Sequence, residues 1–240
     1  MIGSELFGTY LEFMLKGVMV TLRLSVGSLF FGCLIGIVFG MGRASSILWL
    51  RRPIALYVEV LRSIPLLILL FVVFYGLPVA FQIRLDPFAA GIVSMSIYIG
   101  AYMTEVVRAG IEAVPRGQID ASYALGFGYF RMMRRIVFPQ ALRVLLPSAI
   151  GLSIASIKDS SLASIIGLTE LTRAGLVVRQ NTLSNWDVFA FITIFYFVIC
   201  SAVSIVGYLV EERLRVSDRE RGVTPTAGGP GAPLATLDNV

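Results

Sequence analysis

The sequence predicts an all-α membrane protein with about five transmembrane helices, and two observations lead to this fold class. First, 57% of the 240 residues are hydrophobic and only 15% are charged, with a mean hydropathy of +0.84. A water-soluble domain of this composition would expose large apolar patches. Second, five apolar runs approach the roughly 20 residues that a helix needs to cross a bilayer. These runs are residues 18–41, 54–77, 88–107, 144–166 and 188–210.

The runs divide the chain into three parts. Residues 1–17 are expected to form an extracytoplasmic or interfacial segment, residues 18–210 the transmembrane domain, and residues 211–240 a cytoplasmic tail. The first run is too long, and lies too far from the start, to be a cleavable signal, so it is expected to remain in the membrane. From residue 217 onward the tail has too little apolar content to form a core, which predicts disorder there.

The arginines predict the orientation of the spans. The loops after the first and third runs are rich in arginine, whereas the loop after the second has only Arg84, beside Asp86. Because cytoplasmic loops carry an excess of positive charge, we expect the N-terminus outside and the C-terminus in the cytoplasm. Arg23, Arg173 and Arg179 run against this pattern but are outnumbered. The arginines on the expected cytoplasmic side are Arg43, Arg51, Arg52, Arg108, Arg116, Arg131, Arg134, Arg135 and Arg143.

Small residues and one proline predict how the spans pack and bend. Ser28, Gly32, Gly36 and Gly40 recur every four residues in the first run, which gives a stripe on which a neighbouring helix can approach closely. Pro65 lies within the second run, where its ring leaves a backbone carbonyl without its helical partner. The proline therefore predicts a bend there, or a loosened turn that neighbouring groups re-satisfy.

Cysteine and histidine usage argues against a metal or disulfide site. Cys33 and Cys200 each lie inside an apolar run, where a free cysteine behaves as a small packing residue. The sequence contains no histidine, the commonest metal ligand and the usual proton shuttle near neutral pH. We expect no metal or other cofactor in this chain, and no metalloenzyme activity.

The polar loop at about residues 111–143 is longer than a simple connection and predicts structure of its own. Residues 119–125 fit about two helical turns, and Gly126 and Gly128 are suited to a left-handed cap at their end. A second helix is expected from Tyr129 to Pro139, where the proline marks a bend. The product is a short projecting helix with small side chains, which has the shape of a docking element. The alternative is a loop helix that packs only against its own protein.

Ionisable residues inside the runs mark a candidate solute pathway. Lys158 and Asp159 interrupt the fourth run, and ionisable groups at membrane depth usually face a cavity or one another. With the hydroxyl of Ser160, this pair fits the carboxylate and ammonium groups of an α-amino acid; the alternative is an internal ion pair that holds a bend. Arg62 and Ser63 are a second candidate, although Arg62 also fits a side chain that extends to the cytoplasmic surface.

Residues 120–139 carry a pattern that resembles a known family. Its elements are Asp120, Ala121, Ser122, Gly126, Ile136, Phe138 and Pro139. Their spacing is similar to that of the signature loop in permease subunits of binding-protein-dependent ABC importers. The chain departs from that signature conservatively, with Asp for Glu, Ser for the second Ala and Phe for Leu. Residues 61–67, 101–118, 138–143, 157–162 and 165–171 resemble the branch of these permeases that transports polar amino acids.

This resemblance implies a fold, partners and roles for individual residues. The fold would be that of a type I importer permease in a bacterial inner membrane. The short loop helix would be a coupling helix that binds a cytoplasmic ATPase dimer through Asp120, Ala121 and Gly126. Ser122, Ala124, Leu125, Ile136 and Pro139 would support that contact.

The other implied partners are a second permease subunit, identical or homologous, and an extracytoplasmic solute-binding protein. The chain has no Gly-x-x-x-x-Gly-Lys-Ser/Thr phosphate loop, so ATP and magnesium would be bound by the ATPase partner. Relatives that transport basic amino acids often carry Glu where this chain has Leu152, which favours either a neutral or acidic amino acid as the substrate or solute binding by a homologous partner subunit. Nothing in the sequence indicates nucleic-acid binding.

Two other classes of function compete with this interpretation. A self-sufficient secondary transporter would need its own coupling-ion site and commonly has an inverted repeat, and five spans with one long loop do not divide in that way. A channel or a membrane enzyme would need a filter loop or a nucleophile with its base. No such constellation stands out in the sequence.

Overall fold

The computed structural model describes residues 4–183 and 185–220, and the regular elements in that part of the chain are all helical. The α-helices are α1 (Ser4–Ala44), α2 (Leu48–Ser63), α3 (Leu66–Phe71), α4 (Leu77–Phe81), α5 (Pro87–Glu112), α6 (Arg116–Ala124), α7 (Tyr129–Met132), α8 (Phe138–Asp159), α9 (Leu171–Thr182) and α10 (Asn185–Glu220). Two π-helical turns, Val72–Gly76 and Met133–Val137, and a 3₁₀ helix, Ser160–Ile166, connect some of them.

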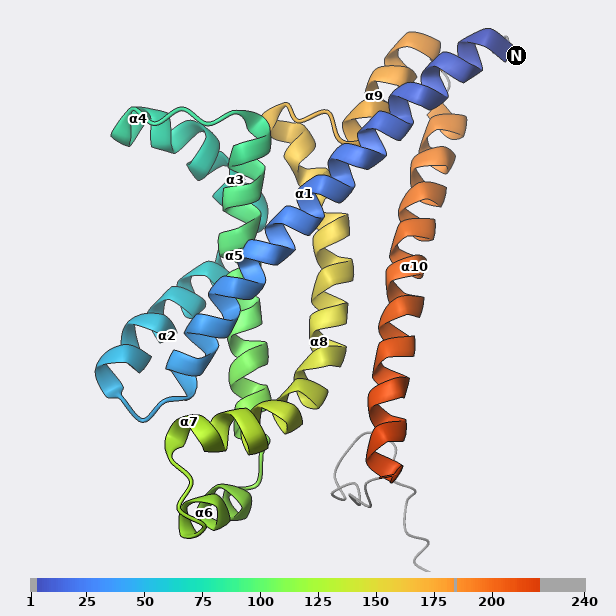
Figure 1. Ribbon diagram of the computed structural model, residues 1–240. Coiled ribbons are helices and arrows are strands. Elements are labelled where there is room, and N and C mark those ends of the chain that lie inside the picture. Colours follow the sequence, from blue (N-terminus) through green and yellow to red (C-terminus); the bar gives the residue numbers. More distant parts are fainter. Residues whose placement is uncertain (1–3, 184, 221–240) are drawn as a thin grey trace, which may run out of the picture.

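The long helices run between two ends of the molecule (Figure 1). One end carries α6 and α7 together with the C-terminal ends of α1 and α5, and we call it the α6 end. The opposite end carries α4, α9 and the beginning of α1, and we call it the α9 end. Both arginine-rich loops lie at the α6 end, as expected if they share one side of a membrane.

The prediction of about five spans is confirmed within the described residues. Four helical stretches are long and apolar enough to cross a membrane: Tyr10–Ala44, Pro87–Glu112, Tyr129–Ile166 and Asn185–Arg213. A fifth candidate is the pair Leu48–Ser63 and Leu66–Phe81, whose two parts are bent by 103°.

Helix α5 lies at the centre of the packing. It begins at a cap in which the Asp86 side chain accepts a hydrogen bond of 2.6 Å from the Ala89 N–H, followed by Pro87 at the first turn. Of its most apolar stretch 61% is buried, against 33% or less for the other long spans. The main hydrophobic cluster joins Met95 and Ile99 of α5 to Leu24, Leu70 and Ala163 on α1, α3 and the 3₁₀ helix.

The small-residue stripe of α1 packs directly on α5, as predicted. A Cβ atom added to Gly36 would lie 2.3 Å from the Met103 Cγ atom, and one added to Gly40 would lie 2.5 Å from the Val107 Cβ atom. Such distances are shorter than real carbon contacts, so only glycine permits this separation of the two backbones. The stripe therefore sets the distance between α1 and α5.

The second predicted span is broken rather than merely bent. The helix stops at Ser63, Ile64 and Pro65 take extended ψ values of 129° and 137°, and a new helix starts at Leu66. The ring of Pro65 disfavours a helical residue before it, and the buried side chains of Leu66 and Leu70 fix the second segment against the core. Tertiary packing thus turns the expected kink within one helix into a break between two separate helices.

Pro139 does not end the helix before it. Phe138 has helical angles (φ −60°, ψ −44°), and the π-helical turn Met133–Val137 precedes it. A widened turn of this kind accommodates a proline without breaking the helix. Figure 1 shows the chain changing direction between α7 and α8, so the bend is present but the helix continues through it.

Both terminal helices are longer than predicted. Helix α1 starts at Ser4, and an exposed salt bridge of 2.7 Å between Glu12 and Lys16 spans a later turn of its first part. Helix α10 continues to Glu220, because Glu and Arg, which make up six of the ten residues from Glu211 onward, are good helix formers. The expectation of disorder is therefore wrong for residues 217–220, and residues 221–240 lie outside the described part of the chain.

The α1–α5 contact predicts a sharp difference between two identical substitutions. Gly40→Ala places its Cβ 2.5 Å from Val107 and 3.0 Å from the Thr104 carbonyl oxygen, so we expect a loss of about 1–3 kcal/mol from overpacking. Gly151→Ala in α8 meets no atom within 4 Å and should be neutral or slightly stabilising, because alanine favours a helix. Thermal unfolding of the purified variants in detergent compares them; equal melting temperatures would contradict the close contact.

Candidate functional site

Helix α6 ends in a backbone motif that depends on one glycine. The Gly126 N–H donates to the Tyr123 carbonyl at 2.9 Å and the Phe127 N–H to the Ser122 carbonyl at 3.0 Å, the two bonds of a Schellman motif. Gly126 has a φ of +74°, in the left-handed region. Gly128, also expected to form a left-handed cap, instead has a φ of −71° and precedes α7.

The predicted docking residues differ in their exposure. Asp120, Ala121, Ala124, Leu125 and Gly126 are exposed on α6 and its C-terminal turn, and Leu125 keeps 74% of its surface. The structure thus places these five on a projecting surface. In contrast, Ser122 is buried and donates a hydrogen bond of 2.6 Å to the Ile119 carbonyl.

The rest of the loop forms a small core that supports α6. Val114, Met132 and Val137 are buried together, and Phe127 packs against them. The side chain of Gln140 on α8 donates a hydrogen bond to Gln118 on α6. Ile136 is half-buried and Pro139 is exposed beside this core. The short helix therefore keeps a fixed position relative to α8.

Exposed aromatic residues extend the α6 surface beyond the predicted set. Tyr123, Tyr129 and Phe130 keep 51%, 59% and 77% of their surface. An exposed apolar cluster of this kind is typical of an interaction site. These three residues are not part of the spaced signature, so the signature did not predict them. Aromatic residues in an otherwise polar loop were, however, visible in the sequence.

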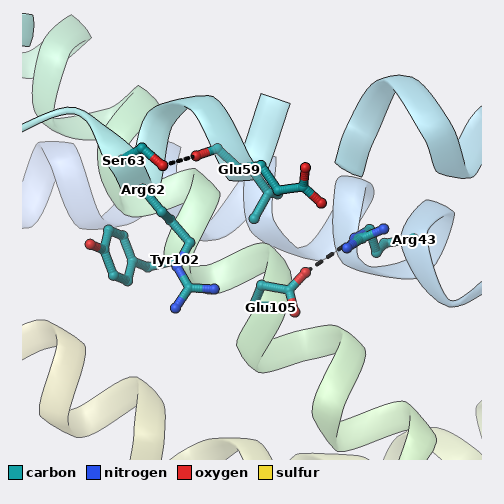
Figure 2. Close-up of a pocket in the computed structure, with 7 residues that line it drawn as sticks. Arg43, Glu59, Arg62, Ser63, Tyr102 and Glu105 are labelled. Carbon is teal, nitrogen blue, oxygen red and sulfur yellow. Dashed lines mark hydrogen bonds and ion pairs between the residues drawn. The ribbon is translucent and has the colours of Figure 1, made fainter. Parts of the chain in front are cut away.

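A polar pocket of about 410 Å³ opens between α1, α2 and α5. Figure 2 shows the guanidinium groups of Arg43 and Arg62 and the carboxyl groups of Glu59 and Glu105 around it. Its lining residues are Arg43, Val58, Glu59, Arg62, Ser63, Tyr102 and Glu105. The predicted pair Arg62 and Ser63 thus belongs to a larger site.

Glu105 links two helices through two arginines. Its carboxylate accepts from the Arg43 Nε atom at 3.1 Å and forms a salt bridge of 2.7 Å with the Arg108 Nη2 atom. Arg108 in turn contacts Glu112, one turn further along α5. Glu105 and Arg43 are largely shielded from solvent, with 18% of each side chain exposed, whereas Glu112 keeps 52% of its side chain exposed. The network ties the end of α1 to the last turns of α5, immediately before α6.

Arg62 lies over an aromatic ring. Its guanidinium carbon is 5.1 Å from the centre of the Tyr102 ring, a cation–π distance. Tyr98 donates a hydrogen bond of 3.2 Å from its hydroxyl to that of Tyr102. Arg62 and Asp159 both lie close enough to Tyr98 to interact with it electrostatically. The structure therefore brings the two predicted groups of pathway residues to the same region.

In the part of the chain that the structure describes, Lys158 and Asp159 form no salt bridge with each other. Lys158 is exposed and Asp159 is half-buried at the last residue of α8. Ser160 is fully buried and donates a hydrogen bond of 2.6 Å to the Ile157 carbonyl. Leu152 packs against the main hydrophobic cluster. The helix changes to a 3₁₀ helix at Ser160, so the pair lies at a structural transition.

Sequence reasoning did not identify the four other charged or aromatic residues of the pocket. Arg43 and Glu59 lie near the ends of spans, where charged residues are common, and Tyr102 and Glu105 lie in a stretch that was used only for family resemblance. Their partners are distant in sequence, as in the Arg43–Glu105 pair, which is separated by 62 residues. An ionisable residue inside an apolar run was the one available signal for Glu105.

Known membrane transport proteins are similar to this chain over most of its length. A family model described as "Binding-protein-dependent transport system inner membrane component" matches residues 32–216. The L-cystine transport system permease protein TcyB of Bacillus subtilis is 36% identical over 199 residues, which cover 82% of this chain and 85% of that protein. The glutamine transport system permease protein GlnP of Escherichia coli is 32% identical over 85% of this chain and 93% of its own length.

Solved structures show the same architecture. The chain superposes on a crystal structure of an amino acid ABC transporter with histidines, with a TM-score of 0.80 and 31% identity over 86% of this chain and 96% of the other. An inward-facing structure of the MetNI methionine ABC transporter gives a TM-score of 0.72 at 23% identity, over 85% of this chain and 97% of the other. The second similarity concerns the fold alone.

The α6 cap predicts that Gly126 and Gly128 respond differently to alanine. Gly126→Ala forces a left-handed residue with a Cβ atom, which costs roughly 1–2 kcal/mol and weakens the Schellman bonds. Gly128→Ala has a φ of −71° and open space around it, so it should be tolerated. Hydrogen–deuterium exchange at the Phe127 amide measures this directly. We expect faster exchange in Gly126→Ala alone, and equal protection in both variants would argue against the motif.

The Glu105 network predicts unequal effects of two isosteric changes. Glu105→Gln leaves the shielded Arg43 and Arg108 without their shared carboxylate and should lower stability by about 1–3 kcal/mol. Glu112→Gln removes a carboxylate that is 52% exposed, so we expect at most about 1 kcal/mol. Thermal unfolding in detergent at constant salt provides the measurement. A larger loss from Glu112→Gln would exclude Glu105 as the centre of the network.

Proposed function

This chain belongs to the family of binding-protein-dependent transport system inner membrane components, and from that premise we propose that it imports a polar amino acid as the permease subunit of an ATP-driven transporter. The observation that carries the proposal is the match to permeases named for cystine, glutamine and arginine transport, each over more than four fifths of this chain. A likeness at 31% identity to an amino acid ABC transporter of known structure supports it.

The energy for transport would come from a separate ATPase dimer that docks on α6. The exposed residues Asp120, Ala121, Ala124, Leu125 and Gly126 form the proposed contact, and the nearby exposed aromatic residues enlarge it. Ser122 faces the loop core, so its part is to hold α6 in shape. Because the sequence has no phosphate-binding loop, ATP and magnesium would be bound by that partner.

The proposed orientation places the α6 end in the cytoplasm and the α9 end outside, in a bacterial inner membrane. The arginine-rich loops gathered at the α6 end support it, because positive charge favours the cytoplasmic side. A solute-binding protein would then deliver substrate at the α9 end. A second permease subunit, identical or homologous, would complete the translocation pathway.

The proposed pathway passes the region that Arg62, Tyr98 and Asp159 share. A guanidinium or ammonium group there binds the carboxylate of an amino acid, and a carboxylate binds its ammonium group. Lys158 and Ser63 add a second cation and a hydroxyl near this region. Leu152 offers no carboxylate to a cationic side chain, which favours a neutral or acidic amino acid. Both guanidinium and carboxylate groups line the route, so a zwitterion fits it better than a simple ion.

Transport itself is tested with the reconstituted complex. Liposomes that contain this chain, its permease partner, the ATPase and the solute-binding protein should accumulate label from a mixture of L-cystine, L-glutamine and L-arginine when ATP is supplied. Lys158→Ala should raise the KM by roughly tenfold or more, since a hydrogen bond to a charged group contributes about 1.5–3 kcal/mol. Lys16→Ala is the matched control, because that lysine is 72% exposed at the α9 end. Unchanged KM and rate in Lys158→Ala would exclude this lysine from the pathway.

Docking of the ATPase on α6 is tested by co-purification. Ala124→Glu adds a charged side chain to the proposed contact, and we expect the ATPase to be lost from the purified complex. Leu183→Glu adds the same charge to another exposed position, which keeps 85% of its surface, at the opposite end of the molecule and should retain the ATPase. Retention by both variants would show that the ATPase binds elsewhere.

A further inference from the structure

The start of α2 carries two exposed arginines directly after a group of exposed apolar residues, and neither the docking helix nor the pocket uses them. Arg51 and Arg52 are exposed, and Trp49 keeps 92% of its surface. The exposed apolar residues are Ile47, Leu48, Trp49 and Leu50. We call residues 47–52 the Trp49 segment. An exposed surface that combines apolar and basic side chains in this way is typical of an interaction site.

Helix α2 is fixed against its neighbours on one side. Its buried residues are Ile54 and Val58, and a Cβ atom added to Gly42 of α1 would lie 2.7 Å from the Ile54 Cδ1 atom. The Tyr57 hydroxyl donates a hydrogen bond of 2.8 Å to the Ile97 carbonyl of α5. These contacts determine which face of α2 is turned away from the rest of the molecule.

The face turned away from α1 and α5 includes part of the Trp49 segment. Trp49, Arg52 and Leu56 follow one another at spacings of three and four residues, so they share one side of the helix. All three are exposed. An aromatic ring, a guanidinium group and an aliphatic side chain are therefore available together to a partner outside the chain.

The two arginines of the segment have no acidic partner nearby. The sequence has no Asp or Glu from residue 44 to residue 58. In the described part of the chain, no salt bridge joins Arg51 or Arg52 to a carboxylate. Arg43, at the end of α1, is instead paired with Glu105. The segment thus presents two positive charges without a counter-charge, which suits an anionic partner.

The position of the segment favours a lipid as that partner. The apolar stretch Tyr10–Ala44 ends just before it, and the chain turns back there at the α6 end of the molecule (Figure 1). The end of a membrane span lies at the level of the lipid headgroups, where tryptophan is enriched because its ring is amphipathic. A guanidinium group binds a phosphate through paired N–H donors.

We propose that the Trp49 segment binds an anionic lipid in the leaflet at the α6 end. Arg51 and Arg52 bind the phosphate of the headgroup, and Trp49 and Leu48 pack against the upper part of its acyl chains. Apolar insertion and charge attraction act together here, as stable binding at a membrane surface requires. The inference does not rest on the solute or on the ATPase and requires only that the chain lies in a bilayer.

The two tryptophans of the sequence, Trp49 and Trp186, allow a direct test. Trp186→Phe leaves Trp49 as the fluorescent residue of the full chain, which is reconstituted in vesicles of phosphatidylglycerol and phosphatidylcholine in equal parts. One of the two lipids carries a nitroxide near the carboxyl end of an acyl chain and quenches a tryptophan that it contacts. We expect phosphatidylglycerol to be favoured at Trp49 by roughly fivefold or more, the factor that one arginine contributes at an anionic surface.

Trp186 provides the comparison within the same chain. It keeps 89% of its surface and lies beside Asp187, near the α9 end, with no arginine next to it in sequence. In the Trp49→Phe variant we expect the two lipids to quench Trp186 about equally.

Three double variants separate a local site from general surface charge. Arg51→Gln with Arg52→Gln should abolish the preference at Trp49, whereas Arg51→Lys with Arg52→Lys keeps the charge and should retain most of it. Arg134→Gln with Arg135→Gln removes two exposed arginines elsewhere at the α6 end and should leave the preference unchanged.

A second measurement uses the assembled transporter. In a chain with Cys33→Ala and Cys200→Ala, Trp49→Cys gives a single thiol that is labelled with a fluorophore before the partner subunits are added. The same nitroxide lipids should quench this fluorophore in the complex, with the same preference for phosphatidylglycerol.

Every other outcome overturns the proposal. Equal quenching of Trp49 by the two lipids, or a preference that survives in the double Gln variant, would show that Arg51 and Arg52 bind no anionic lipid. A loss that is equally large in the Arg134 and Arg135 control would indicate general surface charge. Absence of quenching by either lipid, in the chain or in the complex, would show that protein covers the segment.

Discussion

The close contact between α1 and α5 is the constraint on which the other features depend. In a lipid environment there is no gain from removing apolar surface from water, so two helices associate through dispersion contacts and therefore need backbones that approach closely. Gly36 and Gly40 permit that approach. Helix α5 then presents Tyr102 and Glu105 to the pocket and continues toward α6. The contact thus fixes the pocket and the docking helix relative to one another.

Polar groups inside this apolar molecule are arranged in two physically different ways. At the pocket, Glu105 and two arginines compensate one another's charge, and Arg62 rests on an aromatic ring. At the α9 end, Glu170 is surrounded by neutral N–H and O–H donors. In both places, removal of one partner leaves shielded polar groups unpaired, which carries a penalty. The pocket is therefore held together by compensating charges and the Glu170 cluster by neutral donors.

Features encoded by neighbouring residues were predictable from the sequence. Runs of apolar residues predicted the spans, and the repeat of small residues predicted the close contact of α1 with α5. Gly126 predicted the end of α6, because that end depends only on the left-handed backbone conformation of this one residue. Features that depend on distant partners were not. The Arg43–Glu105 pair and the Thr21–Glu170 contact join residues separated by 62 and 149 positions, and Pro65 alone could not show whether the helix would bend or turn by 103°. The burial of Ser122 likewise depends on how the rest of the loop packs against α6.

The length of α1 has a consequence for how the molecule sits in a bilayer. Its 41 residues extend about 60 Å at 1.5 Å per residue, roughly twice the hydrocarbon thickness of a membrane. Figure 1 shows this helix crossing the molecule diagonally, and such a tilt shortens its projection on the membrane normal. Tilt absorbs part of the excess, and the turn with the exposed Glu12–Lys16 pair belongs in water. The beginning of α1 therefore extends beyond the hydrocarbon region of the bilayer at the α9 end of the molecule.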